Sequence, residues 1–130
     1  MANYEAVMRS NPFRVRDREA FALWIEETVG NELQIDFVTN SPDKVVILGN
    51  TDLPTDDQEG EEIDFAGTLA SHLKPNSIAV IFGAGHEKLR YLCGWAVAIH
   101  PNGEVVEINL TDIYKEAQEA FPDDEIQEAF

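Results

Sequence analysis

Hydrophobic and polar residues alternate along the second half of the chain in a pattern that predicts three consecutive strands. Apolar runs at 78–82, 91–100 and 105–110 are separated by short polar stretches. The last two runs are joined by Pro101, Asn102 and Gly103, residues that form the tight turns of antiparallel hairpins. This region therefore predicts a three-stranded antiparallel meander.

Three other stretches repeat apolar residues at the three- and four-residue spacing of a helix. The first covers 18–29, with Asp17 as its N-cap and Gly30 as a left-handed C-cap. The second begins after Asp64, and the third follows the meander, with Thr111 or Asp112 as its cap. In the third helix the residues expected to point into the core are Ile113, Ala117 and either Ala120 or Phe121.

Shorter patterns predict strands at 13–16, 33–38 and 44–48, the last of them covered on both faces. Residues 1–12 show little periodicity and end in Ser10, Asn11 and Pro12, which predicts a leading loop. The order is strand, helix, two strands, helix, three strands and helix. We therefore expect one α+β domain over residues 1–130, with an antiparallel or mixed sheet of about five or six strands and about three helices mostly on one face.

The strand at 91–100 predicts two different faces for this sheet. Its larger side chains, among them Cys93 and Trp95, share the face that is expected to pack against the helices. Cys93 is therefore expected to be a buried, unreactive thiol. The opposite face carries Gly94, Ala96 and Ala98, and we expect the chain's own loops to cover it, with docking of a partner as the alternative.

The charge of the chain restricts its partners. The 25 acidic and 9 basic residues give a formal net charge of -16, while a hydrophobic content of 44% is typical of a folded protein. Such a charge repels the phosphates of nucleic acids and anionic membranes, so neither is expected as a direct partner. A basic protein would be attracted. The alternative is that the charge only keeps the protein soluble or suits a high-salt habitat.

The charges are unevenly placed. Residues 51–64 hold seven acids and no base, and 122–130 continue a second base-free stretch, so we expect a mobile acidic loop and an acidic tail. The loop does not match a calcium-binding template, because placing Gly60 at the sixth position puts Ala66 where a bidentate Glu is required. Loose binding of divalent cations is the alternative. Four arginines in the first 18 residues either polarise the molecule or pair with surface carboxylates: Arg9, Arg14, Arg16 and Arg18.

The cysteine count and the N-terminal sequence bear on location. A lone Cys93 cannot form an internal disulfide, which favours the cytoplasm. The N-terminal residues lack a basic segment followed by an apolar core, and no apolar run has the length of a membrane span.

The turn expected at 83–87 is the one place where the sequence suggests small-molecule chemistry. Gly83 and Gly85 would let backbone amides approach an anion, and His86 beside Glu87 could act as a base or a ligand. The turn lacks the remaining residues of a dinucleotide or phosphate-loop motif, so a plain hairpin connection is the simpler interpretation. The histidines and Cys93 show no zinc-site spacing. We therefore predict no catalytic residue, no metal and no cofactor.

The sequence favours a small acidic, non-enzymatic interaction protein that binds a basic protein partner, as an inhibitor, an immunity-like module or a mimic of DNA charge. The alternative is a small enzyme or ligand-binding domain that uses the turn from Gly83 to Glu87 and the adjacent sheet face. A homodimer through a sheet edge or that face is compatible with either. The residues expected to bind the partner are Asp52, Asp56, Asp57, Glu59, Glu61, Glu62, Asp64, Asp123, Asp124 and Glu125.

Overall fold

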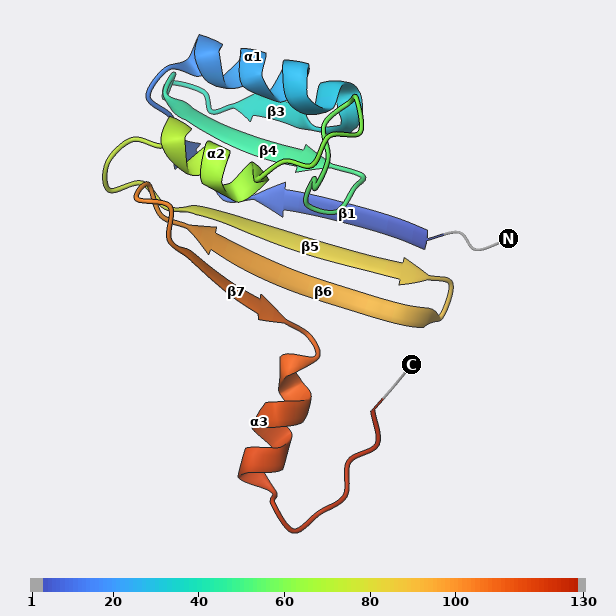
Figure 1. The fold of residues 1–130 in the computed structure, drawn as a ribbon. Helices are drawn as coiled ribbons and strands as arrows, with labels where there is room; N and C mark the ends of the chain where they lie inside the picture. Colours follow the sequence, from blue (N-terminus) through green and yellow to red (C-terminus); the bar gives the residue numbers. More distant parts are fainter. Residues whose placement is uncertain (1–3, 129–130) are drawn as a thin grey trace.

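Seven antiparallel strands form one sheet, and two of the three helices cover one of its faces (Figure 1). The structure is a computed structural model and describes residues 4–128. The strands follow the order β2-β4-β1-β5-β6-β7, with β3 on the outer side of β4. The predicted α+β class is confirmed. The elements are β1 (Tyr4–Ser10), β2 (Phe13–Arg14), α1 (Arg18–Val29), the 3-10 turn η1 (Gly30–Glu32), β3 (Gln34–Phe37), β4 (Lys44–Gly49), α2 (Phe65–His72), β5 (Ala79–Glu87), β6 (Arg90–Ile99), β7 (Val105–Asn109) and α3 (Asp112–Ala120).

The leading loop predicted for residues 1–12 is wrong for the part that the structure describes. Residues 4–10 form β1, which pairs with β5 along its whole length and with β4 at its C-terminal end, so it lies in the middle of the sheet. Residues 1–3 lie outside the described chain. The sequence of this strand does not alternate cleanly between apolar and polar residues. The apolar Val7 points outward with Glu5 and Arg9, while the polar Ser10 faces the core with Met8.

β1 and β2 pair one after the other with β4, and polar side chains hydrogen-bond across the break between these two strands. The Ser10 hydroxyl accepts a hydrogen bond from the Ile47 backbone N–H at 2.9 Å and donates to the Asn11 carbonyl. The Asn11 side chain accepts from the Val80 N–H and donates to the Ile78 carbonyl. These bonds replace the ladder that Pro12, which has no N–H, interrupts.

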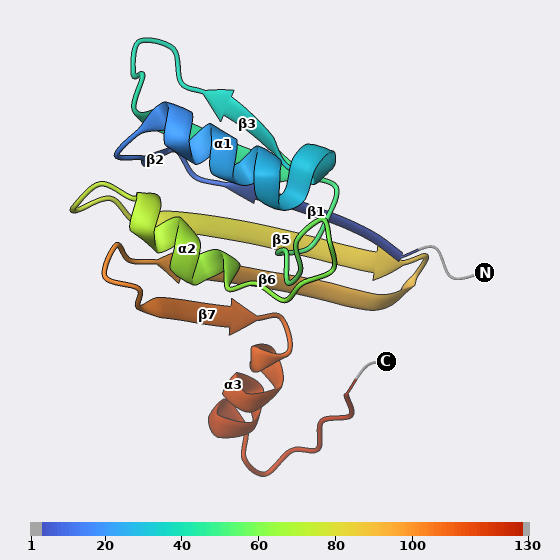
Figure 2. The same ribbon diagram turned by 45° about the horizontal axis from the view of Figure 1, so that its top comes forward.

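Both predicted caps of the covering helices are confirmed. The Asp17 carboxylate accepts hydrogen bonds from the N–H groups of Glu19 and Ala20, and Asp64 accepts one from Gly67. Gly30 ends α1 with φ of 59°, a conformation that costs glycine little. These ends fix the lengths of α1 and α2, which lie side by side over the sheet (Figure 2).

The core lies between these helices and the inner face of the sheet. Phe21, Ile25 and Val29 of α1 and Leu69 of α2 are buried against strand residues. The inner residues of β6 are Val97 and Ile99, as the alternation predicts. The complete cluster of buried residues is Met8, Phe13, Val15, Phe21, Ile25, Val29, Leu33, Val45, Ile47, Phe65, Leu69, Ala70, Leu73, Ala79, Ile81, Val97 and Ile99.

The meander is confirmed, but β5 is longer than predicted. It runs through the glycine-containing stretch to Glu87, and the connection to β6 is made at Lys88 and Leu89. The second turn lies at 101–103, where Gly103 has φ of 96°. The turn predicted at 83–87 is therefore wrong: this stretch is strand, because the small glycines leave room for aromatic side chains on the inner face of the sheet.

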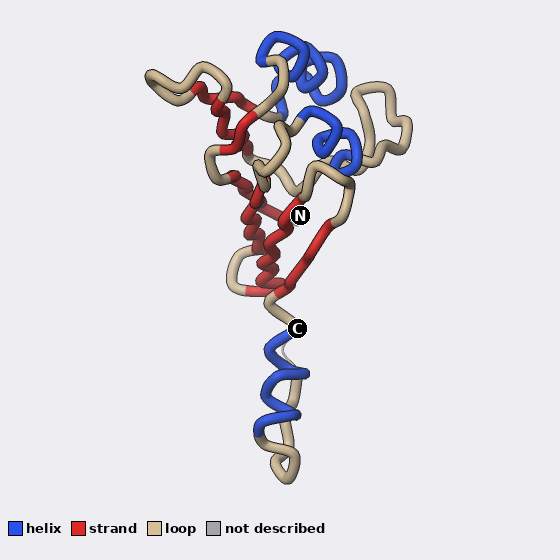
Figure 3. Tube along the Cα trace, turned by 90° about the vertical axis from the view of Figure 1, so that its left-hand side faces the viewer, coloured by secondary structure: helices blue, strands red, loops and turns tan. Residues whose placement is uncertain are grey.

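The helix α3 forms as predicted, but the inward orientation predicted for its apolar residues is wrong. No residue of α3 is buried, and Ile113 and Phe121 are 63% and 59% exposed. Only Leu110 and Thr111 separate α3 from β7, and the helix leaves the sheet as a projecting arm (Figure 3). We call α3 and residues 121–128 the C-terminal arm. Among the described helices, none is long and apolar enough to cross a membrane.

Candidate functional site

An acidic surface is built where the loop at 51–64 packs against the C-terminal end of α1. The Gln58 side-chain amide donates to the backbone carbonyls of Glu26 and Glu27, both at 2.9 Å, and the Gln58 N–H donates to the Thr28 carbonyl. Leu53 and Ile63 anchor the loop on the core. These contacts hold the acids of the loop beside those of the helix. We define the acidic surface as Glu26, Glu27, Asp56, Asp57, Glu59, Glu61 and Glu62.

The loop has an internal structure of its own. Asp56 and Glu62 lie opposite each other in a short antiparallel bridge, and the Ile63 N–H donates to the Thr55 carbonyl. The Asp57 carboxylate accepts hydrogen bonds from the N–H groups of Glu59 and Glu61. Asp57 thus closes the tip of the loop around Gly60, whose φ is 83°. The predicted mobility of this loop stays a prediction.

No basic side chain neutralises the acidic surface within the described part of the chain. The ion pairs of residues 4–128 all lie elsewhere. Asp43 pairs with Arg14 at 2.8 Å and with Lys74 at 2.9 Å, and Glu5 pairs with His86 at 3.5 Å. Lys74 first, and then Arg14, hold the pKa of Asp43 down at about 2. The acids of the surface therefore keep their charge available to another molecule.

The arginines of the first 18 residues are used elsewhere. Arg14, in β2, pairs with Asp43. The Arg16 side chain donates a hydrogen bond to the Leu73 carbonyl at 2.8 Å. The Arg18 guanidinium lies 3.7 Å from the centre of the Phe37 ring, a cation–π contact. Arg9 forms none of the ion pairs found in residues 4–128. Pairing with surface carboxylates thus holds for one arginine of the four.

A polar hollow of about 520 Å³ opens beside the acidic surface. It is lined by Leu23, Glu26, Glu27, Gly30, Asn31 and Gln58. The C-terminal end of a helix carries partial negative charge, which adds to that of the two glutamates. The hollow can therefore receive the cationic end of a lysine or arginine side chain.

The structure separates the two groups of predicted partner-binding residues. The loop acids lie on the helix-covered side of the sheet, whereas Asp123, Asp124 and Glu125 lie on the C-terminal arm, at the far end of the molecule (Figure 1). Residues 129–130 of the predicted acidic tail lie outside the described chain. Asp52 approaches the Tyr4 hydroxyl, and Asp64 caps α2.

The residues proposed for the alternative ligand site do not converge on a hollow. Gly83, Gly85 and Glu87 of β5 lie on the inner face of the sheet. His86 lies on the outer face, opposite Glu5 of β1. The His86 ring also contacts the Lys88 carbonyl at 3.0 Å through Nδ1. Neither of two hollows on the described surface is lined by these four residues. The alternative ligand site stays a prediction.

Cys93 is exposed, so its predicted burial is wrong. It lies on the inner face as expected, but beyond the edge of the helix layer, and its Sγ is 3.3 Å from the Tyr4 hydroxyl. The Tyr4 phenol lies over Gly85, where a Cβ would overlap it. The hydrogen bond with Cys93 is the main cause that raises the pKa of Tyr4 to about 12. The pair links β1 to β6 across β5.

His72 of α2 packs against aromatic side chains of α1. His72 stacks on Trp24 with ring centres 4.9 Å apart and meets the edge of Phe21 at 5.7 Å. Burial lowers the pKa of His72, and Asp17 opposes this shift. Within residues 4–128, no three histidine, cysteine, aspartate or glutamate side chains lie together in a way that could hold a metal ion.

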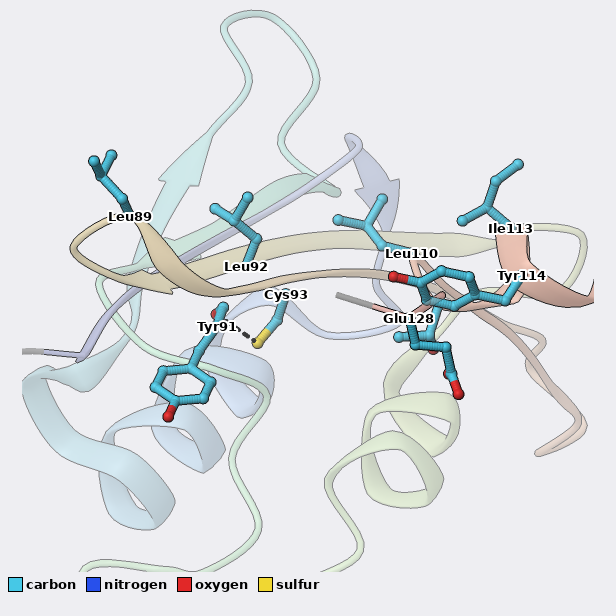
Figure 4. A pocket seen from close by; sticks show the side chains of 9 residues that line it. Leu89, Tyr91, Leu92, Cys93, Leu110, Ile113, Tyr114 and Glu128 are labelled. Carbon is cyan, nitrogen blue, oxygen red and sulfur yellow. Dashed lines mark hydrogen bonds between the residues drawn. The ribbon is translucent and has the colours of Figure 1, made fainter. Parts of the chain in front are cut away.

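The outer face of the sheet is not covered by the chain's own loops, so that prediction is wrong. Cross-strand pairing places Phe82, Ala96 and Ile108 in one row and Ala98 and Val106 in the next. Beyond them, Leu92, Leu110 and Ile113 point to this same side of the sheet, while Tyr91 and Cys93 point to the other (Figure 4). We call this uncovered side the open face.

The extent of the open face was missed from the sequence, although one signal was present. Val80, Phe82 and Ala84 alternate with the core residues of β5, and the small residues Gly94 and Ala96 of β6 lie beside them. The sequence did not show the path of α3, which was expected to return to the core.

Comparison with protein-family models, with curated proteins and with solved structures finds no match to this chain.

Proposed function

We propose that this protein is a small, non-enzymatic interaction protein that binds a basic protein partner through the acidic surface and thereby occludes the partner's basic site. The observation that supports this most is that the hydrogen bonds of Gln58 hold the loop against α1, so that the acids of both lie together beside a polar hollow. A chain of net charge -16 attracts a basic partner over the screening length, about 8 Å at physiological salt.

The chemistry of the surface specifies the contact. Lysine or arginine side chains of the partner would pair with Glu26, Glu27 and the loop carboxylates, none of which has an ion-pair partner in the described chain. Glu26, Glu27 and the loop acids other than the half-buried Asp57 are exposed, so pairs that they form at the edge of the contact would stay partly hydrated and lose little solvation. A partner that normally holds nucleic acid would lose access to it, which is the inhibitor form of the proposal. A cytoplasmic location belongs to the same proposal.

The test begins with capture of partners from the native host's lysate and continues with the purified partner. Binding is measured by calorimetry at about 0.1 M and about 1 M salt, between which the screening length falls from about 10 Å to about 3 Å. We expect the affinity to fall steeply over this range. A partner whose affinity does not change with salt would contradict the proposal.

Charge location is tested with two variants that lose the same number of acids. One changes Glu26, Glu27, Glu59, Glu61 and Glu62 to glutamine. The matched control changes five acids of the C-terminal arm to the corresponding amides: Glu116, Glu119, Asp123, Asp124 and Glu125. We expect the first variant to bind at least about tenfold more weakly than the control, because close charge pairs at an interface contribute about 1.5 kcal/mol or more each. Equal losses would contradict a contact centred on the acidic surface, and would mean that net charge or the acids of the arm attract the partner as strongly.

A further inference from the structure

The open face is an apolar surface that nothing in the described chain covers. Apart from the half-buried Val80, its large residues are each more than half exposed: Val7 53%, Phe82 59%, Leu92 72%, Val106 69%, Ile108 61% and Leu110 59%. Both covering helices lie on the other side of the sheet (Figure 3). Monomeric proteins seldom expose a contiguous apolar patch above a few hundred Å².

The helix of the C-terminal arm is short and buries none of its residues. Helix α3 has nine residues, and isolated helices shorter than about 12–15 residues are marginal in water. None of its residues is buried, and neither is any residue of β7, the strand that leads into it. Helix α3 follows β7 after the two residues Leu110 and Thr111 and projects away from its own sheet (Figure 3).

The arm and the open face form one continuous surface. Leu110 covers Gly94 of β6, where an added Cβ would meet its side chain at 2.7 Å. Ile113 continues this apolar row onto α3, on the side to which Leu89 and Leu92 also point (Figure 4). Between the arm and the start of β6 lies a groove of about 800 Å³, lined mainly by apolar side chains of these elements.

We propose that a second copy of this chain covers the open face, so that two sheets pack face to face and α3 of each copy lies along the sheet of the other. The proposal uses a surface separate from the acidic surface and does not depend on the proposed function.

Three observations favour a second copy as the occupant. The six residues of the open face together with Ile113 and Phe121 expose on the order of 800 Å² of large apolar residues, taking about 170 Å² for each when fully exposed, and about 800 Å² per partner is what a standard interface buries. The chain supplies both halves of the contact, an exposed apolar sheet face and a helix with exposed apolar residues. Such a two-fold arrangement uses the same patch on both copies.

Charge supplies the third observation. The acidic surfaces of two face-to-face copies would lie on opposite outer sides, separated by a sheet spacing of about 10 Å and by a helix layer beyond each sheet, which exceeds the screening length. Arg9, which shares the open face with Phe82 and forms no ion pair among the described residues, would meet the acids of the partner's α3.

The test is the mass of the intact chain in solution, measured by sedimentation equilibrium from about 1 µM to about 100 µM, the range in which an interface of this size is expected to become occupied. We expect twice the chain mass of 14.6 kDa at the upper end. Raising the salt is expected to leave the dimer intact, because its contacts are mainly apolar and the two chains repel each other less. A monomer throughout the range would overturn the proposal and leave the face to a different partner.

Variants locate the interface. Phe82→Asp combined with Ile108→Asp is expected to weaken association by at least about tenfold, and Ile113→Asp should do the same through the arm. The matched control is Leu23→Asp, which places the same charge at a residue 54% exposed on α1. Circular dichroism establishes that each variant is folded. A folded double variant that dimerises as the wild type does would place the contact at a sheet edge or on the helix side and refute the proposal.

Discussion

Ser10 has a larger effect on stability than its size suggests, because its hydroxyl replaces a missing rung of the sheet. It is the last residue of β1, directly before the break between β1 and β2. Ser10 is 5% exposed, and its hydroxyl accepts a hydrogen bond from the backbone N–H of the fully buried Ile47. In Ser10→Ala this buried N–H loses its acceptor. The cost of leaving a buried donor unsatisfied is about 1–3 kcal/mol.

The control for this substitution is Ser77→Ala. The Ser77 hydroxyl accepts a hydrogen bond from the Arg14 N–H at 2.8 Å, so it performs the same task for another strand, but in an exposed setting. Water can take over that bond, and we expect a loss of no more than about 0.5 kcal/mol. The pair therefore separates the effect of burial from that of the hydroxyl itself.

The assay is urea unfolding at one fixed chain concentration, followed by the fluorescence of Trp24 and Trp95. For Ser10→Ala we expect the midpoint to fall by about 1 M with an unchanged slope, taking a loss of about 2 kcal/mol and a slope of about 2 kcal/mol/M. The melting temperature should fall by about 3–5 °C for each kcal/mol in a chain of this length. A Ser10→Ala variant no less stable than Ser77→Ala would refute the reasoning.

Two further predictions concern the aromatic side chains of the inner face. In Gly83→Ala the added Cβ overlaps the Trp95 indole, so we expect a loss of about 1–3 kcal/mol and a shifted tryptophan emission, both absent from the exposed control Ala84→Ser; an unchanged spectrum would show that the indole does not lie over Gly83. Burial lowers the pKa of His72 below its usual 6.5, so the unfolded chain binds this proton more readily, and the stability due to neutral His72 is fully present above about pH 6.5 and is lost as the pH falls below it. We expect His72→Phe, which keeps the contact with Trp24, to lose less stability than the wild type between about pH 7.5 and about pH 5.5 in urea titrations, and an equal loss would place the titrating group elsewhere.

Local patterns in the sequence were sufficient for most of the elements. The caps at Asp17 and Asp64, the left-handed Gly30 and the turn at 101–103 depend on backbone preferences and on hydrogen bonds within a few residues. The face of β6 that meets the helices followed from simple alternation. The acidic composition of the loop and of the tail was likewise visible without a structure.

The tertiary structure alone decided which of these elements meet. Residues 4–10 form a central strand because β4 and β5 offer them hydrogen-bonding edges, a long-range condition that local periodicity does not contain. Exposure of Cys93 follows from where the helix layer ends, not from which way the side chain points. The acids of the loop and of α1 form one surface only because Gln58 bridges residues more than thirty positions apart in sequence. The same holds for the open face, which exists because α3, amphipathic in sequence, projects away from the sheet and does not cover it (Figure 3).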